Sequence, residues 1–176
     1  MKKSSLVFQS IRSLTVAAML TAVSVIIGIF CKNLLNFGNG LFRITFENLP
    51  IILSGILFGP IVGGFVGVAT DLISYLLSNQ VYPPNLIVTL GACLIGVLSG
   101  TVSRIPFRHQ TARIVCSATT AHLIGSMLVK SVGLYQYYGI LVLWRIPLYL
   151  VISSVEILLL CLLLRRKSIQ RLMETI

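Results

Sequence analysis

Residues 41–71, LFRITFENLPIILSGILFGPIVGGFVGVATD, place an arginine, a glutamate and an aspartate inside an otherwise apolar stretch. The whole chain is apolar, since 56% of its 176 residues are hydrophobic and only 10% are charged. Soluble domains have about 25% charged residues, so the composition predicts a membrane protein. A charge near the bilayer centre costs about 2.5–3.5 kcal/mol on insertion scales and usually faces protein, water or a ligand. The charges of this stretch are therefore the first candidates for a binding site.

The apolar segments predict an all-α membrane protein with six transmembrane helices in a single domain, residues 1–176. A spanning helix needs about 20 apolar residues, and glycine, proline or basic residues separate the segments. We expect helices at residues 11–30, 46–58, 61–78, 85–103, 111–129 and 143–164. The segment GLYQYYG, residues 133–139, is expected to be an interfacial loop. No A-x-A-like cleavage site follows the basic N-terminus before Lys32, so the first helix is expected to stay uncleaved.

The distribution of basic residues predicts the orientation. With six spans, both termini share one side of the membrane, and ten of the fourteen basic residues fall on that side. They are Lys2, Lys3, Arg12, Arg104, Arg108, Arg113, Arg165, Arg166, Lys167 and Arg171. The positive-inside rule then places both termini in the cytoplasm. The net charge of +10 is explained by these helix ends, and we expect no nucleic-acid partner.

Small residues recur at helical spacing in four predicted helices. Gly55, Gly59, Gly63 and Gly67 follow one another every four residues across the tight reversal at Gly59-Pro60. Residues four apart share a helix face, so the helices on either side of the reversal are expected to approach to backbone contact. The fourth predicted helix carries a similar stripe, and Ala18 and Ala22 share a face of the first. Ordinary packing within the molecule is the simpler interpretation of that alanine pair.

The four remaining basic residues fall on the outer side, where the orientation does not require them: Lys32, Arg43, Lys130 and Arg145. Arg43, Lys130 and Arg145, together with Glu47 and Asp71, are predicted to line an outward-facing pocket. Arginine and lysine bind carboxylates, whereas a buried carboxylate binds paired N–H donors of a heterocycle. The alternative is that these charges pair with one another and hold helices together.

Aromatic residues accompany the charges at the outer level. Trp144 is placed to stack on a ring-containing ligand, and Tyr75 lies one helical turn beyond Asp71. Asn85, at the start of the fourth predicted helix, completes the set of candidate ligand-binding residues. Aromatic residues at this level also form the belt that anchors membrane proteins in the interface, and this remains an alternative for the tyrosines.

Two further polar residues lie deep in the predicted helices. Glu156 is about 16 Å into the last helix, near the midplane. It suits a proton or ion relay, or a neutral carboxyl hydrogen-bonded to a serine or threonine. His122 is expected to be a hydrogen-bonded packing residue rather than a ligand.

The chain lacks the sequence motifs of the common enzyme classes. The G-x-S-x-G, H-E-x-x-H and Walker A patterns are missing, and the four cysteines lie far apart. We therefore predict no catalytic residue, no metal, no cofactor and no enzyme activity. A small membrane enzyme that uses Asp71, His122 or Glu156, and a transporter that acts alone, stay open as alternatives.

Several motifs carry a family resemblance. The run R-I-T-F-E-N-L-P at residues 43–50, G-I-L-F-G-P at 55–60, the glycines after it, Asp71 and W-R-I-P at 144–147 resemble the folate-type (FolT-like) S-components of energy-coupling factor (ECF) transporters. The resemblance covers nearly the whole chain and identifies the superfamily better than the vitamin. Glu47-Asn48 departs from the small or apolar residues usual at that point in the family.

The resemblance implies a substrate-binding subunit of the bacterial cell membrane with the fold of an S-component bundle. Such subunits bind a vitamin on the outside and work with a transmembrane coupling subunit and two cytoplasmic ATPases. It implies that Ala18 and Ala22 contact the coupling subunit. It also implies folate as ligand, with Asp71 or Glu47 at the pterin edge, Trp144 stacking on the ring, and the three outer cations at carboxylates or carbonyls. Thiamine, riboflavin, pantothenate or a related heterocycle is the alternative.

Overall fold

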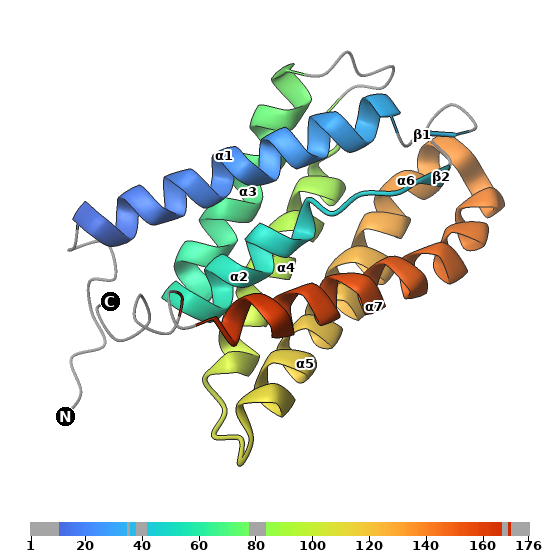
Figure 1. The fold of residues 1–176 in the computed structure, drawn as a ribbon. Coiled ribbons are helices and arrows are strands. Elements are labelled where there is room, and N and C mark those ends of the chain that lie inside the picture. Colours follow the sequence, from blue (N-terminus) through green and yellow to red (C-terminus); the bar gives the residue numbers. More distant parts are fainter. Residues whose placement is uncertain (1–10, 35, 38–41, 78–83, 167–168, 170–176) are drawn as a thin grey trace.

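The computed structural model describes residues 11–34, 36–37, 42–77, 84–166 and 169, and in this part the fold is a helical bundle (Figure 1). Its helices are α1 (Ile11–Leu34), α2 (Asn48–Phe58), α3 (Pro60–Leu77), α4 (Leu86–Ser103), α5 (Gln110–Thr120), the π-helix η2 (Ala121–Val129), α6 (Lys130–Tyr138), the 3₁₀-helix η3 (Gly139–Trp144) and α7 (Arg145–Leu164). A two-residue antiparallel pairing joins β1 (Asn36–Phe37) to β2 (Phe42–Arg43).

Four helical segments of the described chain are long and apolar enough to cross a membrane: Ser13–Leu34, Pro60–Leu77, Leu86–Ser103 and Gln110–Leu164. The last of these contains 55 residues and reverses direction at Gly139, whose φ is 58°. The eleven residues of α2 rise about 16 Å, roughly half of a hydrocarbon layer about 30 Å thick. The all-helical, membrane-type architecture is thus present, whereas the count of six spans and the orientation stay predictions.

Three helices are in backbone contact along the glycine ladder. A Cβ added to Gly63 would lie 2.7 Å from Gly55 Cα on α2 and 2.6 Å from the carbonyl oxygen of Gly96 on α4. The reversal between α2 and α3 needs glycine because Gly59 has a φ of 95°. The predicted backbone contact between the helices of this stretch is therefore confirmed, and the ladder also includes α4.

The prediction of a loop for residues 133–139 is wrong, because α6 continues to Tyr138. Gly133 does not break the helix. It lies against α4, where an added Cβ would be 3.0 Å from Val88 Cγ2 and 3.1 Å from Ile87 Cβ. The chain leaves the α-helical conformation at Gly139, where the positive φ favours glycine, and continues as η3.

The two ends of the bundle carry different connections between helices. In Figure 1 the β1–β2 pairing and the turn between α6 and η3 lie at one end, and the connection between α4 and α5 lies at the other. A buried apolar core of α1–α5, η2 and α7 side chains runs between them, with Ile52, Ile95 and Leu160 fully buried.

Candidate functional site

Lys130 is the centre of a buried polar cluster formed by α2, η2 and α6. Its Nζ lies 3.5 Å from Glu47 Oε1 and 3.2 Å from Asn48 Oδ1, and only 6% of the residue is exposed. Asn48 in turn donates from Nδ2 to Ser126 Oγ at 3.4 Å. The pairing of a buried ammonium with a carboxylate and an amide oxygen offsets the cost of removing it from water. The sequence placed Glu47 and Lys130 in one pocket, and the structure brings them into contact.

Two glycines make room for this cluster. The stem of Lys130 lies against Gly91 of α4, where an added Cβ would be 2.6 Å from Lys130 Cγ. The Glu47 carboxylate lies against Gly28 of α1, where an added Cβ would be 2.8 Å from Glu47 Oε2. Four segments of the bundle, α1, α2, α4 and α6, therefore enclose the charged pair.

Arg145 supplies a second buried cation at the start of α7. Only 3% of the residue is exposed, its Nη2 donates to Tyr149 Oη at 2.9 Å, and its Cζ lies 5.2 Å from the centre of the Tyr149 ring. Its Nε is buried without a hydrogen-bond partner. A buried guanidinium with an unused donor is suited to an anionic or carbonyl group of a ligand.

His122 of η2 and Glu156 of α7 lie in contact deep in the bundle. His122 Nε2 is 2.9 Å from Glu156 Oε2, and the two side chains are 2% and 0% exposed. The pair is close but poorly aligned for hydrogen bonding, so both ring nitrogens and both carboxyl oxygens lack a well-formed hydrogen bond. The expected serine or threonine partner of Glu156 is thus replaced by His122.

This contact fixes the register of η2 and α6 against α7. Lys130 is eight residues after His122, and Tyr149 is seven residues before Glu156 on the antiparallel helix. Both are therefore roughly 10 Å from the His122–Glu156 level in the same direction. Arg145, bonded to Tyr149, is brought toward the level of Lys130 in the half of the bundle that holds the β1–β2 pairing.

Asp71 lies on the other side of α4. Its Oδ2 accepts a hydrogen bond of 2.6 Å from Thr89 Oγ1, and Asp71 is half-buried. On α4, Thr89 contacts Asp71 and Gly91 contacts Lys130. Thr89 and Gly91 are two residues apart, so they face directions about 200° apart around the helix axis. The structure thus brings Glu47 and Lys130 together, whereas Asp71 and Lys130 contact opposite sides of α4.

The remaining predicted ligand-binding residues lie on four different segments of the chain. Tyr75 is half-buried one turn beyond Asp71, and Trp144 is 68% exposed on η3. The side chain of Asn85 caps α4 by accepting from the backbone N–H of Ile87 at 2.9 Å and donates to the Gly133 carbonyl at 2.6 Å. The backbone of Arg43 pairs with Asn36, and its side chain lies outside the described part of the structure.

The spacing of polar residues in the sequence also indicates the partners of these charged groups. Asn48 follows Glu47 directly, and His122, Ser126 and Lys130 occur at intervals of four, which places them along one side of a helix. Tyr149 follows Arg145 at the same interval. Polar residues repeated at intervals of four within an apolar segment indicate a buried polar helix face. A charged residue considered alone does not indicate such a face.

Ala18 and Ala22 lie on the exposed side of α1, whereas the neighbouring Ala17 is 5% exposed. The bundle therefore does not use the alanine pair for its own packing. A close approach by another helix is left possible at this face.

A family model described as "ECF transporter, substrate-specific component" matches residues 12–169. The chain belongs to this family. The predicted resemblance is confirmed, and the protein is an S-component, a membrane-embedded subunit of a transporter family.

The S-component fold is also found by comparison with solved structures. "Crystal structure of FolT bound with folic acid" aligns over 85% of this chain and 88% of that chain, with a TM-score of 0.63 and 21% sequence identity. A shorter match joins 64 residues, 36% of this S-component, to "Uncharacterized protein MG098 homolog" of Mycoplasma pneumoniae at 38% identity. That match spans 13% of the Mycoplasma protein.

Proposed function

We propose that this S-component binds folate, or a closely related vitamin, in the half of the bundle that holds Lys130 and Arg145. The observation that carries the proposal is the pair of buried cations, of which Arg145 has an unused donor at Nε. Folate carries two carboxylates on its glutamate tail and a pterin ring with paired N–H donors. The similarity of fold to a protein crystallised with folic acid supports this choice among vitamins.

Each group of the cluster has a role in this proposal. Arg145 binds a carboxylate through its fork of N–H donors. Lys130 exchanges part of its contact with Glu47 and Asn48 for a ligand oxygen, and Glu47 accepts from the pterin N–H groups. Asp71, across α4, is a second position for the heterocycle, with Tyr75 and Trp144 as stacking residues. Arg43 and Asn85 complete the proposed set.

Transport is proposed to require a transmembrane coupling subunit and two cytoplasmic ATPases, with both termini in the cytoplasm of a bacterial cell. The exposed Ala18 and Ala22 are the proposed contact with the coupling subunit. Arg165 Nη2 lies 3.5 Å from Thr111 Oγ1, so the basic end of α7 lies beside the start of α5. This gathering of basic residues at one end supports the orientation.

The experiment is binding of radiolabelled folate to the purified protein, in parallel with thiamine, riboflavin, biotin and pantothenate. Saturable folate binding at one site is expected. Arg145→Gln should weaken it about 10- to 150-fold, the equivalent of a charged hydrogen bond of about 1.5–3 kcal/mol. Arg145→Lys should restore only part of the affinity, because lysine lacks the bidentate fork.

Arg166→Gln is the matched control, since Arg166 is an exposed cation at the opposite end of the bundle. Saturation by another vitamin without folate binding would replace folate by that vitamin. Equal folate affinity in wild type and Arg145→Gln would remove Arg145 from the site.

A further inference from the structure

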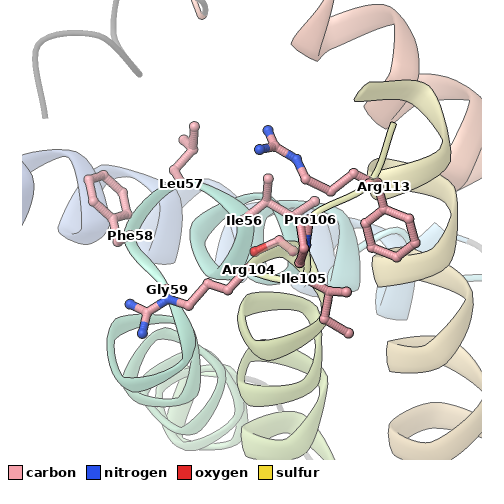
Figure 2. Close-up of a pocket in the computed structure, with 10 residues that line it drawn as sticks. Ile56, Leu57, Phe58, Gly59, Arg104, Ile105, Pro106 and Arg113 are labelled. Atoms are coloured by element: carbon pink, nitrogen blue, oxygen red, sulfur yellow. The ribbon is translucent and has the colours of Figure 1, made fainter. Parts of the chain in front are cut away.

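A cleft of about 460 Å³ lies at the other end of the bundle, between the end of α2 and the connection from α4 to α5 (Figure 2). Ile56, Leu57 and Phe107 contribute apolar walls. Two arginines, Arg104 and Arg113, contribute its charge. The cleft is therefore an open hollow at the ends of membrane helices, with cationic and other polar groups over most of its exposed lining and a few apolar side chains beside them.

Arg113 lines this cleft and has an unused donor. Its Nε is buried and has no hydrogen-bond partner. In Figure 2 its guanidinium end points across the cleft toward Leu57 and Ile56. An unsatisfied buried donor costs about 1–3 kcal/mol, so the position of Arg113 is explained best by an acceptor that binds there.

Arg104 forms the other side. Its guanidinium lies against the backbone of Gly59, where an added Cβ would be 2.9 Å from Arg104 Cζ. The glycine therefore leaves room for the planar group. Arg108 lies between the two arginines in sequence and is exposed.

The field at this cleft is positive. Arg113 is in the first turn of α5, and the N-cap residue His109 makes no side-chain bond to the amides of that turn. A helix N-terminus carries roughly half a positive charge. The described acidic residues, Glu47, Asp71 and Glu156, are bonded elsewhere, to Lys130, Thr89 and His122. No described carboxylate therefore neutralises Arg104 or Arg113.

We propose that this cleft binds a phosphate group, supplied by the headgroup of an anionic phospholipid. Guanidinium groups bind phosphate oxygens in bidentate pairs. Basic pockets between the ends of membrane helices bind anionic headgroups, and by the positive-inside rule this end faces the anionic inner leaflet. The apolar walls accommodate the glycerol backbone and the start of the acyl chains. The proposal is independent of the vitamin that the protein carries.

The test is native mass spectrometry of the full-length protein in detergent, titrated with dioleoyl phosphatidylglycerol or, as the neutral comparison, dioleoyl phosphatidylcholine. One phosphatidylglycerol should bind more tightly than phosphatidylcholine. Arg113→Gln and Arg104→Gln should each weaken it about fivefold or more, since a basic residue near the headgroups contributes about 1 kcal/mol. Arg113→Lys should retain part of the affinity because it keeps the charge.

Arg166→Gln is the matched control, because it removes an exposed cation at the same end of the bundle but outside the cleft. Equal weakening by Arg166→Gln would show diffuse attraction and overturn the proposal, as would equal binding of the two lipids. Inorganic phosphate and glycerol 3-phosphate are added as competitors. Displacement of the lipid by either at low millimolar concentration would make a free anion the ligand and overturn the lipid source. If Arg113→Gln does not fold, Arg104→Gln and Arg113→Lys decide the outcome.

Discussion

Gly63→Ala tests whether backbone contact among α2, α3 and α4 holds the bundle together. The new methyl group would lie 2.6 Å from the Gly96 carbonyl oxygen and 2.7 Å from Gly55 Cα, whereas real Cβ contacts essentially never fall below 3.0 Å. Both obstacles are backbone atoms on different helices, so rotation of a side chain cannot relieve them. At least one helix has to move by about 0.4 Å to reach even the closest observed contact, and further for an ordinary one.

Overpacking of this kind costs about 1–3 kcal/mol, offset by up to about 1 kcal/mol because alanine favours a helix more than glycine does. We expect a net loss of roughly 1–2 kcal/mol in the free energy of unfolding. This corresponds to about 2–4 °C per kcal/mol in the midpoint of thermal unfolding. The assay is thermal unfolding of the purified protein in detergent micelles, followed by circular dichroism.

Gly64→Ala is the matched control, because it makes the same change at the next residue of α3. Its Cβ would lie 2.9 Å from Val97 Cγ2 and 3.4 Å from Cys93 Sγ, and both are side-chain atoms of half-buried residues. We expect Gly64→Ala to shift the midpoint less than Gly63→Ala. A Gly63→Ala protein as stable as the wild type, or as Gly64→Ala, would refute the argument.

Three further predictions use other parts of the structure. His122→Leu and Glu156→Leu should each destabilise the protein by about 3–5 kcal/mol, since each leaves the other group buried alone, and the double variant should lose less than the sum; additive losses in detergent unfolding would show that the pair is not coupled. Asp71→Asn should weaken vitamin binding, because a carboxylate that accepts two N–H bonds becomes a mixed donor and acceptor, and unchanged affinity in the binding assay would exclude Asp71 from the pocket. Ala18→Trp and Ala22→Trp should abolish co-purification with the coupling subunit and spare vitamin binding, and loss of binding would instead indicate internal packing.

The sequence predicted the features that depend on neighbouring residues. The reversal at Gly59-Pro60 and the four-residue spacing of glycines are local patterns, and a local pattern defines which side chains share a helix face. A helix face made of glycines commonly packs against the backbone of another helix, because no side chains keep the two apart. The contact between Gly63 and Gly55 was predictable for this reason.

The rotation of one helix against another was not predictable in the same way. The sequence predicts Asp71 and Lys130 toward the outer ends of their helices, and predicted depth alone favours a shared pocket. Their separation by α4 depends on which side of that helix each one meets, as the contacts of Thr89 and Gly91 show. Which neighbouring helix a given face meets depends on how the whole bundle is assembled, so local sequence patterns do not predict it.

Glycine had two opposite effects that the sequence did not distinguish. Gly133 and Gly139 border the same tyrosine-rich segment, which the sequence predicts to be a loop. Gly133 instead permits close contact with α4, and Gly139 reverses the chain through its positive φ. Only the packing partner separates the two cases.

The π-helix η2 makes the length of this part of the chain more critical than its composition. Its bonds run from residue i to i+5, so residues 121–129 hold more residues per turn than an α-helix does. Deleting a single residue there would let the segment rewind as an α-helix, and the larger rotation per residue of an α-helix would compensate for much of the loss. Inserting a single residue has no such compensation and would rotate everything after it by roughly 80–100° relative to α5. Lys130 would then turn away from Asn48. Substitutions within residues 121–129 are therefore expected to be tolerated more readily in a folding selection than a one-residue insertion.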